Sequence, residues 1–107
     1  MAFGTAAKVA GVRAGDSVWL SQAQMAELFQ TSTQNITQHI KNIYSEGELE
    51  ENTTCKDFLQ VVNRGFKGKI QDNIKHYCLE LIITVGYRVK SRIGTQFRRW
   101  ATEILLI

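Results

Sequence analysis

The segment Leu20–Gly47, "LSQAQMAELFQTSTQNITQHIKNIYSEG", constrains what this 107-residue chain can fold into more than any other stretch. It holds two runs of apolar residues at helical spacing, separated by the three polar residues "QTS". This pattern predicts two helices joined by a tight turn. The second run also carries glutamines, threonines and an asparagine, whose side chains add little to helix stability. Their presence on one helix therefore needs a reason other than folding.

Both predicted helices carry start signals. Ser21 can cap the first helix with its hydroxyl, and Gln24 can complete a capping box with it. Ser32 or Thr33 can cap the second helix, which Gly47 would end in a left-handed conformation. We therefore expect a helical pair over about residues 21–46. The apolar residues expected to fill the space between the two helices are Met25, Ala26, Phe29, Ile36 and Ile40.

Such a pair matches the helix-turn-helix that reads DNA, in which the second helix packs its apolar side on the first and places its polar side in the major groove. Neutral amides and hydroxyls suit this task because they both donate and accept hydrogen bonds, as base edges do. Gln30 replaces the usual turn glycine, at a cost of about 1 kcal/mol for a left-handed non-glycine residue. The predicted base-reading residues are Ser32, Thr33, Gln34, Thr37, Gln38 and Lys41. The alternative is an ordinary helical hairpin whose polar face is merely solvated.

Strand-like segments lie on both sides of the helical pair. A short hairpin is expected from Lys8–Arg13 and Ser17–Leu20. The segments "KDFLQVV" and "IQDNIKHYC" predict a second hairpin over about residues 53–77, around the turn "NRGFKG". In a winged helix-turn-helix such a hairpin contacts the phosphate backbone. The cations at its tip that would do so are Arg64, Lys67 and Lys69, and the alternative is a solvated turn.

Two helices are expected after this hairpin, over about residues 79–106. The first, Leu79–Val85, is short and apolar and is stopped by Gly86. The second is capped by Thr95 and is amphipathic. Its apolar stripe consists of Phe97, Trp100, Ala101, Ile104 and Leu105, while Arg98, Arg99 and Glu103 are expected to face out.

Charge is unevenly distributed along the chain. The net charge is +3, but residues 1–63 hold four Lys or Arg against seven Asp or Glu, and residues 64–107 hold nine against three. A basic C-terminal half favours a polyanionic partner. If the segment between the last two helices is extended, Arg88, Lys90 and Arg92 form a basic comb for phosphates. The competing interpretation is an edge strand kept soluble by its charge.

Few residues suit catalysis or metal binding. The soft metal ligands are two cysteines and two histidines without C-x-x-C spacing, and no G-x-S-x-G, Walker or H-E-x-x-H motif occurs. No apolar run is long enough to span a bilayer, and the N-terminus lacks the apolar core of a secretory signal. We therefore expect a cytoplasmic protein that is not an enzyme, with no cofactor, no metal site, no small-molecule substrate and no membrane attachment.

Two long motifs carry a family resemblance. The segments "VWLSQAQMAELFQTSTQNITQHIKNIYSEGEL" and "YCLELIITVGYRVKSRIGTQFRRWAT" resemble the N-terminal part of the RhuM virulence-protein family of bacteria, over about Val18–Ile104. The second motif is also similar in layout to the Bro-N and KilA-N domains of phage antirepressors. The resemblance implies a bacterial DNA-binding protein, often associated with mobile elements and usually followed by a much longer C-terminal region. The sequence departs from the family before Ser17 and near "VVNRGFKGKIQDN".

These observations predict a single α+β domain over residues 1–107, a winged helix-turn-helix with a β-hairpin and a C-terminal amphipathic helix. Its expected function is sequence-specific binding of double-stranded DNA, as a regulator of transcription in bacteria or mobile elements. The rival hypothesis is a protein-interaction module, antirepressor-like or virulence-associated, that does not read DNA. A homodimer is expected because one recognition helix reads only a few base pairs, and the apolar end Ile104–Ile107 is its candidate surface.

Overall fold

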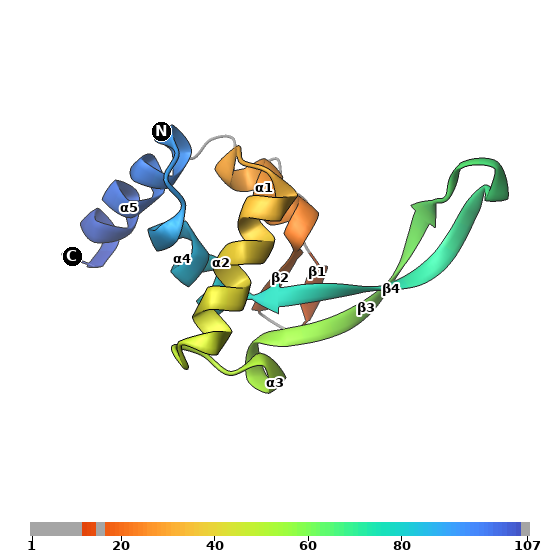
Figure 1. Cartoon of the computed structure of the whole chain (residues 1–107), viewed down its shortest axis with the longest axis horizontal. Coiled ribbons are helices and arrows are strands. Elements are labelled where there is room, and N and C mark those ends of the chain that lie inside the picture. The colour runs from red at the N-terminus through yellow and green to blue at the C-terminus, as the bar shows by residue number, and fades with distance from the viewer. Residues whose placement is uncertain (1–11, 15–16, 106–107) are drawn as a thin grey trace.

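The chain folds into an α+β arrangement, as predicted (Figure 1). The computed structural model describes residues 12–14 and 17–105. The helices are α1 (Gln22–Phe29), α2 (Thr33–Ser45), α3 (Glu51–Thr54), α4 (Leu79–Arg88) and α5 (Arg92–Leu105). The strands are β1 (Val12–Ala14), β2 (Ser17–Ser21), β3 (Cys55–Asn63) and β4 (Lys69–Cys78), with a short 3₁₀ turn, η2 (Gly65–Lys67), between the last two.

The four strands form one antiparallel sheet in the order β1-β2-β4-β3. Strand β2 pairs with β4 only at the base of the hairpin, from Ser21 opposite His76 to Trp19 opposite Cys78. Strands β3 and β4 continue to pair as far as Asn63 opposite Lys69. We call the part beyond the pairing with β2, residues 57–75, the distal hairpin. Figure 1 shows it as a two-stranded ribbon that projects away from the helices.

The core lies where α1, α2, α4 and α5 meet. Met25, Phe29, Ile36 and Ile43 have no exposed surface, and Ile40 is 4% exposed. These residues follow the helical spacing read from the sequence, so the predicted packing of the second helix on the first is confirmed. The rings of Phe29 and Phe97 pack edge to face, with centroids 5.3 Å apart, and join α1 to α5. The helices together form one body, from which the distal hairpin extends.

The start of α1 is fixed by the predicted capping box. The Gln24 backbone N–H donates to Ser21 Oγ over 3.2 Å, and the Ser21 N–H donates to Gln24 Oε1 over 2.9 Å. Ser21 is also the last residue of β2 and pairs with His76. The same residue therefore ends a strand and starts a helix, which sets the angle between the sheet and α1.

Helix α4 is longer than predicted. Gly86 does not end it, because the helix continues to Arg88. A Cβ at Gly86 would lie 2.5 Å from Cε2 of Phe97 and 3.0 Å from Cζ of Phe29. The glycine is therefore explained by the close approach of two aromatic rings rather than by helix termination.

Helix α5 begins four residues earlier than predicted, at Arg92 rather than after a Thr95 cap. Ser91 caps it, since its Oγ accepts from the Gly94 N–H over 3.0 Å. Arg98 also differs from prediction: it does not face out but donates to the carbonyl oxygens at the end of α4. Those acceptors are Gly86, Tyr87 and Val89, at 3.3, 3.3 and 2.9 Å. A cation here satisfies carbonyls that have no partner inside the helix.

The early start of α5 removes the extended segment on which the basic comb depended. Arg88 ends α4, Lys90 lies in the connection, and Arg92 starts α5, so the extended geometry predicted for these three residues is wrong. The edge-strand interpretation of the same segment is wrong for the same reason. The three cations lie at a helix end, in a connection and at a helix start, so they do not form one row along an extended segment.

Smaller differences occur elsewhere. The predicted first hairpin is confirmed for Val12–Ala14 paired with Ser17–Trp19, whereas its portion from Lys8 to Gly11 lies outside the described residues. Between α2 and the hairpin, the acidic stretch "GELEENTTC" contains the one-turn helix α3. The candidate dimer surface Ile104–Ile107 lies outside the residues whose side chains the structure describes.

Candidate functional site

The turn between α1 and α2 has the backbone that the sequence predicted. Gln30 adopts a left-handed conformation, with φ 53° and ψ 53°. The N–H of Thr31 donates to the Ala26 carbonyl over 2.9 Å, which closes the end of α1. Ser32 then caps α2 by accepting from the Asn35 N–H over 3.0 Å. The bend places the two helices against each other within three residues.

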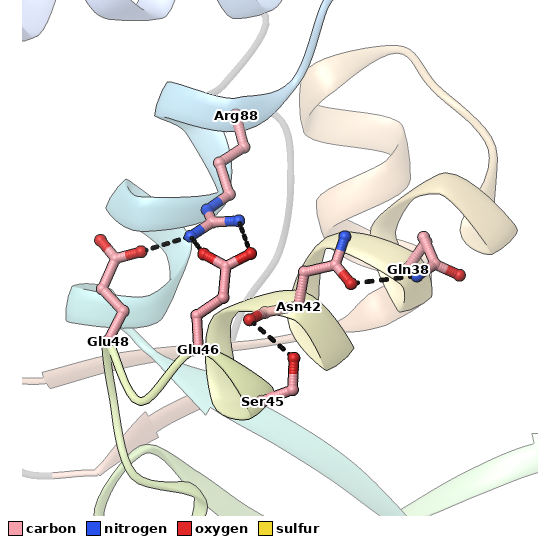
Figure 2. A network of polar contacts seen from close by, with 6 residues as sticks. All are labelled: Gln38, Asn42, Ser45, Glu46, Glu48 and Arg88. Atoms are coloured by element: carbon pink, nitrogen blue, oxygen red, sulfur yellow. Dashed lines mark hydrogen bonds and ion pairs between the residues drawn. The ribbon is translucent and has the colours of Figure 1, made fainter.

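Helix α2 presents one exposed stripe opposite its buried one. Gln34, Gln38, Lys41 and Ser45 recur at spacings of four, three and four residues, and all are exposed. Ser32 and Thr33 are exposed at the start of the same helix. The amide of Gln38 donates to Asn42 Oδ1 over 3.1 Å along the helix surface (Figure 2), and its Oε1 accepts no hydrogen bond within the described part of the chain. The protein's own core covers neither glutamine.

Thr37 differs from the other predicted base-reading residues because its side chain is half-buried. Its Oγ1 donates toward Gln22 Oε1 over 2.6 Å and lies 2.9 Å from the Thr33 carbonyl oxygen. The amide of Gln22 in turn donates to the hydroxyl of Tyr77 over 3.0 Å. This chain of contacts joins α2, α1 and β4. The Thr37 hydroxyl therefore orients α2, and a role for it in contacting bases stays a prediction.

Tyr77, at the end of this chain of contacts, is a buried residue. Tyr77 is 3% exposed, and burial raises the pKa of its hydroxyl above the ordinary value, while the contact from Gln22 acts in the opposite direction. The tyrosine therefore keeps its proton at neutral pH. Sequence reasoning missed Gln22 and Tyr77, because no local pattern links two residues that are 55 positions apart.

The C-terminal end of α2 is held by an ion cluster. Arg88 Nη2 lies 2.7 Å from Glu46 Oε1 and 2.6 Å from Glu48 Oε1, and Figure 2 shows its guanidinium between the two carboxylates. The hydrogen bond from Arg88 lowers the pKa of Glu46, and the two carboxylates raise the pKa of Arg88. Two negative charges already neutralise this guanidinium. Arg88 is therefore a poor candidate for the phosphate contact that the sequence predicted.

A second anchor lies on the other side of the same helix end. The hydroxyl of Tyr44 lies 2.8 Å from Thr54 Oγ1, which donates to the Glu50 carbonyl over 2.6 Å. Partial burial raises the pKa of Tyr44 to about 12. The two anchors fix α2 to α3 and α4, so its exposed stripe has a defined direction relative to the hairpin.

The connection between α4 and α5 runs beside α1 and α2. Ser91 Oγ donates to the Phe29 carbonyl over 3.0 Å, next to the turn. The pKa of His39 on α2 is lowered, first by burial and then by the charges of Arg88 and Lys90. Lys90 and Arg92 are exposed. The structure thus places Lys90 and Arg92, two of the three predicted comb residues, on either side of Ser91, which contacts the end of α1, and neither forms an ion pair within residues 18–103.

The tip of the distal hairpin carries the other predicted phosphate contacts. Arg64 forms an ion pair with Asp72. Lys67 and Lys69 are exposed, and no carboxylate within residues 18–103 lies at ion-pair distance from either. Sequence reasoning passed over Phe66, which is 100% exposed between these cations. The signal was present in the turn "NRGFKG", where an aromatic residue lies between two glycines and among three cations.

Alternative kinds of site find little support in the described residues. Within residues 12–14 and 17–105, no three His, Cys, Asp or Glu side chains gather in a way that could hold a metal ion. In the same residues, no helix is both long and apolar enough to cross a membrane. Cys55 and Cys78 are free thiols. The candidate site within the described residues therefore consists of the exposed stripe of α2 and the cations around it.

A family comparison identifies the kind of protein. The model of the virulence protein RhuM family matches residues 53–106, which is about half of the chain. The chain belongs to the RhuM family. The match begins inside α3 and covers the whole β3–β4 hairpin, α4 and α5, and it confirms the resemblance carried by the second long motif. No curated protein and no solved structure matches the chain. The RhuM-like character of Val18–Asn52 and the likeness to Bro-N and KilA-N domains stay predictions.

Proposed function

We propose that this domain binds double-stranded DNA in a sequence-specific manner, with α1 and α2 as a helix-turn-helix and the β3–β4 hairpin as its wing. The observation that carries the proposal is the exposed polar stripe of α2 beside a left-handed turn at Gln30. The contact of Thr37 with Gln22 and the two anchors at the C-terminal end of α2 support it, because base reading requires a helix held in a defined orientation.

The side chains on this stripe suit base edges in the major groove. Gln34 and Gln38 can each pair with adenine through an amide that donates and accepts, and Lys41 can donate to guanine or to a phosphate. Ser32 and Thr33, at the N-terminus of α2, lie where a recognition helix first contacts the bases. A carboxylate on this stripe would repel phosphates, and the exposed residues of α2 from Thr33 to Ser45 include none.

The backbone contacts come from two places. Lys67 and Lys69 at the hairpin tip carry free positive charge, with Arg64 partly neutralised by Asp72. Lys90 and Arg92 lie near α2 on the body. Each phosphate that such a cation neutralises releases counterions, so binding depends steeply on salt concentration.

Membership of the RhuM family, a family of virulence proteins, supports a bacterial setting for this proposed activity. We propose a transcriptional regulator that works in the bacterial cytoplasm and binds as a homodimer. Two copies would read half-sites about 34–36 Å apart, one turn of the duplex. The rival role is a protein-interaction module, and it draws support from two exposed apolar residues on the distal hairpin, Leu59 at 61% and Val61 at 62%.

A salt titration of duplex binding separates the two roles. We expect the chain to shift a random duplex at low salt, with affinity falling linearly as log salt rises. Replacing both Lys67 and Lys69 by Ala should reduce the magnitude of that slope by about 2. The Lys90→Ala, Arg92→Ala pair tests the body cations with the same loss of charge. The control pair is Lys56→Ala, Arg99→Ala, two exposed cations outside both regions. No shift of the wild-type chain at low salt would favour the protein-interaction role.

Base reading is tested by removing the two amides of the stripe. Gln34→Ala with Gln38→Ala should abolish preference for the sequence selected from a random duplex library, and should keep most of the nonspecific binding. Asn52→Ala, which removes an exposed amide from α3, is the matched control. Unchanged sequence preference in the double variant would show that α2 does not read bases.

A further inference from the structure

The aromatic ring at the tip of the distal hairpin has no role in folding. Phe66 is 100% exposed, whereas a buried phenylalanine side chain stabilises a protein by about 1.5–3 kcal/mol. Single exposed apolar residues are common on proteins and mean little alone. Phe66 differs because of how the backbone holds it and what surrounds it.

The turn that carries Phe66 is tightly hydrogen-bonded. The Arg64 N–H donates to the Gly68 carbonyl over 2.9 Å, and the Gly68 N–H donates to the Gly65 carbonyl over 2.9 Å. Asn63 Oδ1 accepts from the Gly65 N–H over 3.0 Å. Both glycines have positive φ, 67° for Gly65 and 76° for Gly68. The ring is therefore presented on an ordered turn, so little entropy is lost when it enters a partner.

The charges around the ring specify a polyanion. From Asn63 to Asp72 the chain holds three cations and a single carboxylate, which is already paired with Arg64. Lys67 follows the ring directly, and Lys69 begins β4. An apolar group surrounded by cations matches a DNA duplex. The faces of its bases are apolar, and phosphates line its grooves.

The reach of the hairpin places this ring away from α2. Seven residue pairs, from Asp57 opposite Lys75 to Asn63 opposite Lys69, lie beyond the pairing with β2. At about 3.3 Å per residue they extend the ribbon by about 23 Å. Figure 1 shows that this extension points away from the helical body. At about 3.4 Å per base pair, the tip can reach a groove well outside the bases read by α2.

We propose that Phe66 inserts from the minor groove between adjacent base pairs of the bound duplex, as an apolar wedge that unstacks the step and bends the DNA. Lys67 and Lys69 contact the flanking phosphates. This inference rests on the proposed DNA binding. Apolar wedges are used in this way by proteins that bend DNA, and the deformation favours flexible pyrimidine–purine steps. A membrane surface fits less well, because one ring on a thin ribbon offers little apolar area to a lipid layer.

The test combines a gel shift, a bending assay on circularly permuted duplexes, and duplexes that carry 2-aminopurine at successive steps. The wild-type chain should bend the duplex and raise 2-aminopurine fluorescence at one step, where stacking is lost. Phe66→Ala should bind about tenfold more weakly, without bending and without the fluorescence rise. Phe66→Leu, which keeps an apolar wedge, should retain both signals. Val61→Ala, another exposed apolar residue of the same hairpin, is the control and should behave as wild type.

Each contrary result has a distinct meaning. If Phe66→Ala binds in a salt-dependent manner and bends DNA as well as the wild type, the wedge is wrong and the proposed DNA binding stands. If the wild-type chain binds no duplex at low salt, the proposed function is wrong and the wedge falls with it. If Phe66 is instead required for sedimentation with phosphatidylserine vesicles while DNA stays unbent, the tip binds membranes and the wedge is wrong.

Discussion

The helical body and the distal hairpin use their apolar residues in opposite ways. In the body, Met25, Phe29 and Leu81 have no exposed surface, while on the hairpin Val61 is 62% and Phe66 100% exposed. These buried side chains of the body are explained by its own folding. Phe58 at the base of the hairpin also packs on Trp19 and His76, but Val61 and Phe66 are not buried by residues 18–103, so a reason for these two must be sought in a partner.

Charges divide in the same way. The guanidinium of Arg88 is held between two carboxylates and fixes α2 to α4. At the hairpin tip, Lys67 and Lys69 lack such partners among the described residues. Arg88 of the body is therefore neutralised by internal ion pairs, whereas at the hairpin tip Asp72 pairs with Arg64 and leaves Lys67 and Lys69 without a carboxylate partner among the described residues. The comparison teaches that the two regions should respond differently to mutation: changes in the buried core of the body should lower stability, whereas changes at the hairpin tip should affect binding and leave stability nearly unchanged.

The largest expected effect on stability comes from replacing a phenylalanine by alanine in each of the two regions. Phe29→Ala should lower the free energy of unfolding by about 3–5 kcal/mol, because it leaves a cavity in the core. Phe66→Ala should change it by less than about 0.5 kcal/mol. Urea denaturation followed by circular dichroism measures both. Phe29→Leu, with a smaller loss in the same direction, serves if Phe29→Ala does not fold. Equal losses at the two positions would contradict the division between body and hairpin.

A smaller loss of stability is expected from a substitution at Gly86, where α4 packs closely on the ring of Phe97. Gly86→Ala gains helix propensity, but its Cβ would meet Phe97 at 2.5 Å, and overpacking of this kind costs about 1–3 kcal/mol. We expect the overpacking to exceed the gain of about 1 kcal/mol from helix propensity. Thermal denaturation of Gly86→Ala beside Ile83→Ala, a change on the exposed side of α4, measures the difference. A Gly86→Ala protein more stable than wild type would show that α4 and α5 pack less closely than described.

The turn between α1 and α2 gives an effect of opposite sign. Gln30→Gly removes left-handed strain of about 1–2 kcal/mol, and the added freedom of the unfolded chain offsets about 0.4–1 kcal/mol of it. A small net stabilisation is therefore expected. The matched control is Gln34→Gly inside α2, which should destabilise by about 0.5–1 kcal/mol. Denaturant midpoints of the two variants should move in opposite directions, and movement in the same direction would argue against the left-handed turn.

The smallest effect concerns His39, whose pKa is lowered by burial and by nearby positive charge. Because the unfolded chain binds a proton at His39 more readily than the folded one, stability should fall as pH drops through 6.5 and below. His39→Gln should make the melting temperature less sensitive to pH between about 7.5 and 5.5. Glu46, with its own lowered pKa, acts only below about 4.5 and does not interfere. An unchanged pH dependence would show that His39 is not held neutral by the body.

Much of the fold could be predicted because its signals are local. The capping box of Ser21 and Gln24, the left-handed residue Gln30 and the apolar stripe of α2 each depend on neighbours in the sequence. The hairpin around "NRGFKG" was recognisable from its strand-forming residues and glycines. These features required no knowledge of the tertiary structure, so alternation, spacing and turn chemistry sufficed.

The errors occurred where distant residues decide the outcome. Gly86 looks like a helix end in the sequence, but the ring of Phe97 from the next helix explains it. Arg88 looks like a free cation, but Glu46 and Glu48, about 40 residues earlier, take its charge. The Thr37 hydroxyl is taken by a glutamine from α1. In each case the neighbour becomes visible only after the chain has folded.

The contacts from Thr37 through Gln22 to Tyr77 have a mechanical consequence. Tyr77 belongs to β4, and this strand runs unbroken to Lys69 at the far tip, so in the proposed DNA complex one continuous strand would join the contact made by α2 to the contact made by the hairpin tip. The distance between these two contacts is then set by the protein and not by the DNA. Inserting half a helical turn of DNA between the site of α2 and the site of the hairpin tip should therefore break one of the two contacts.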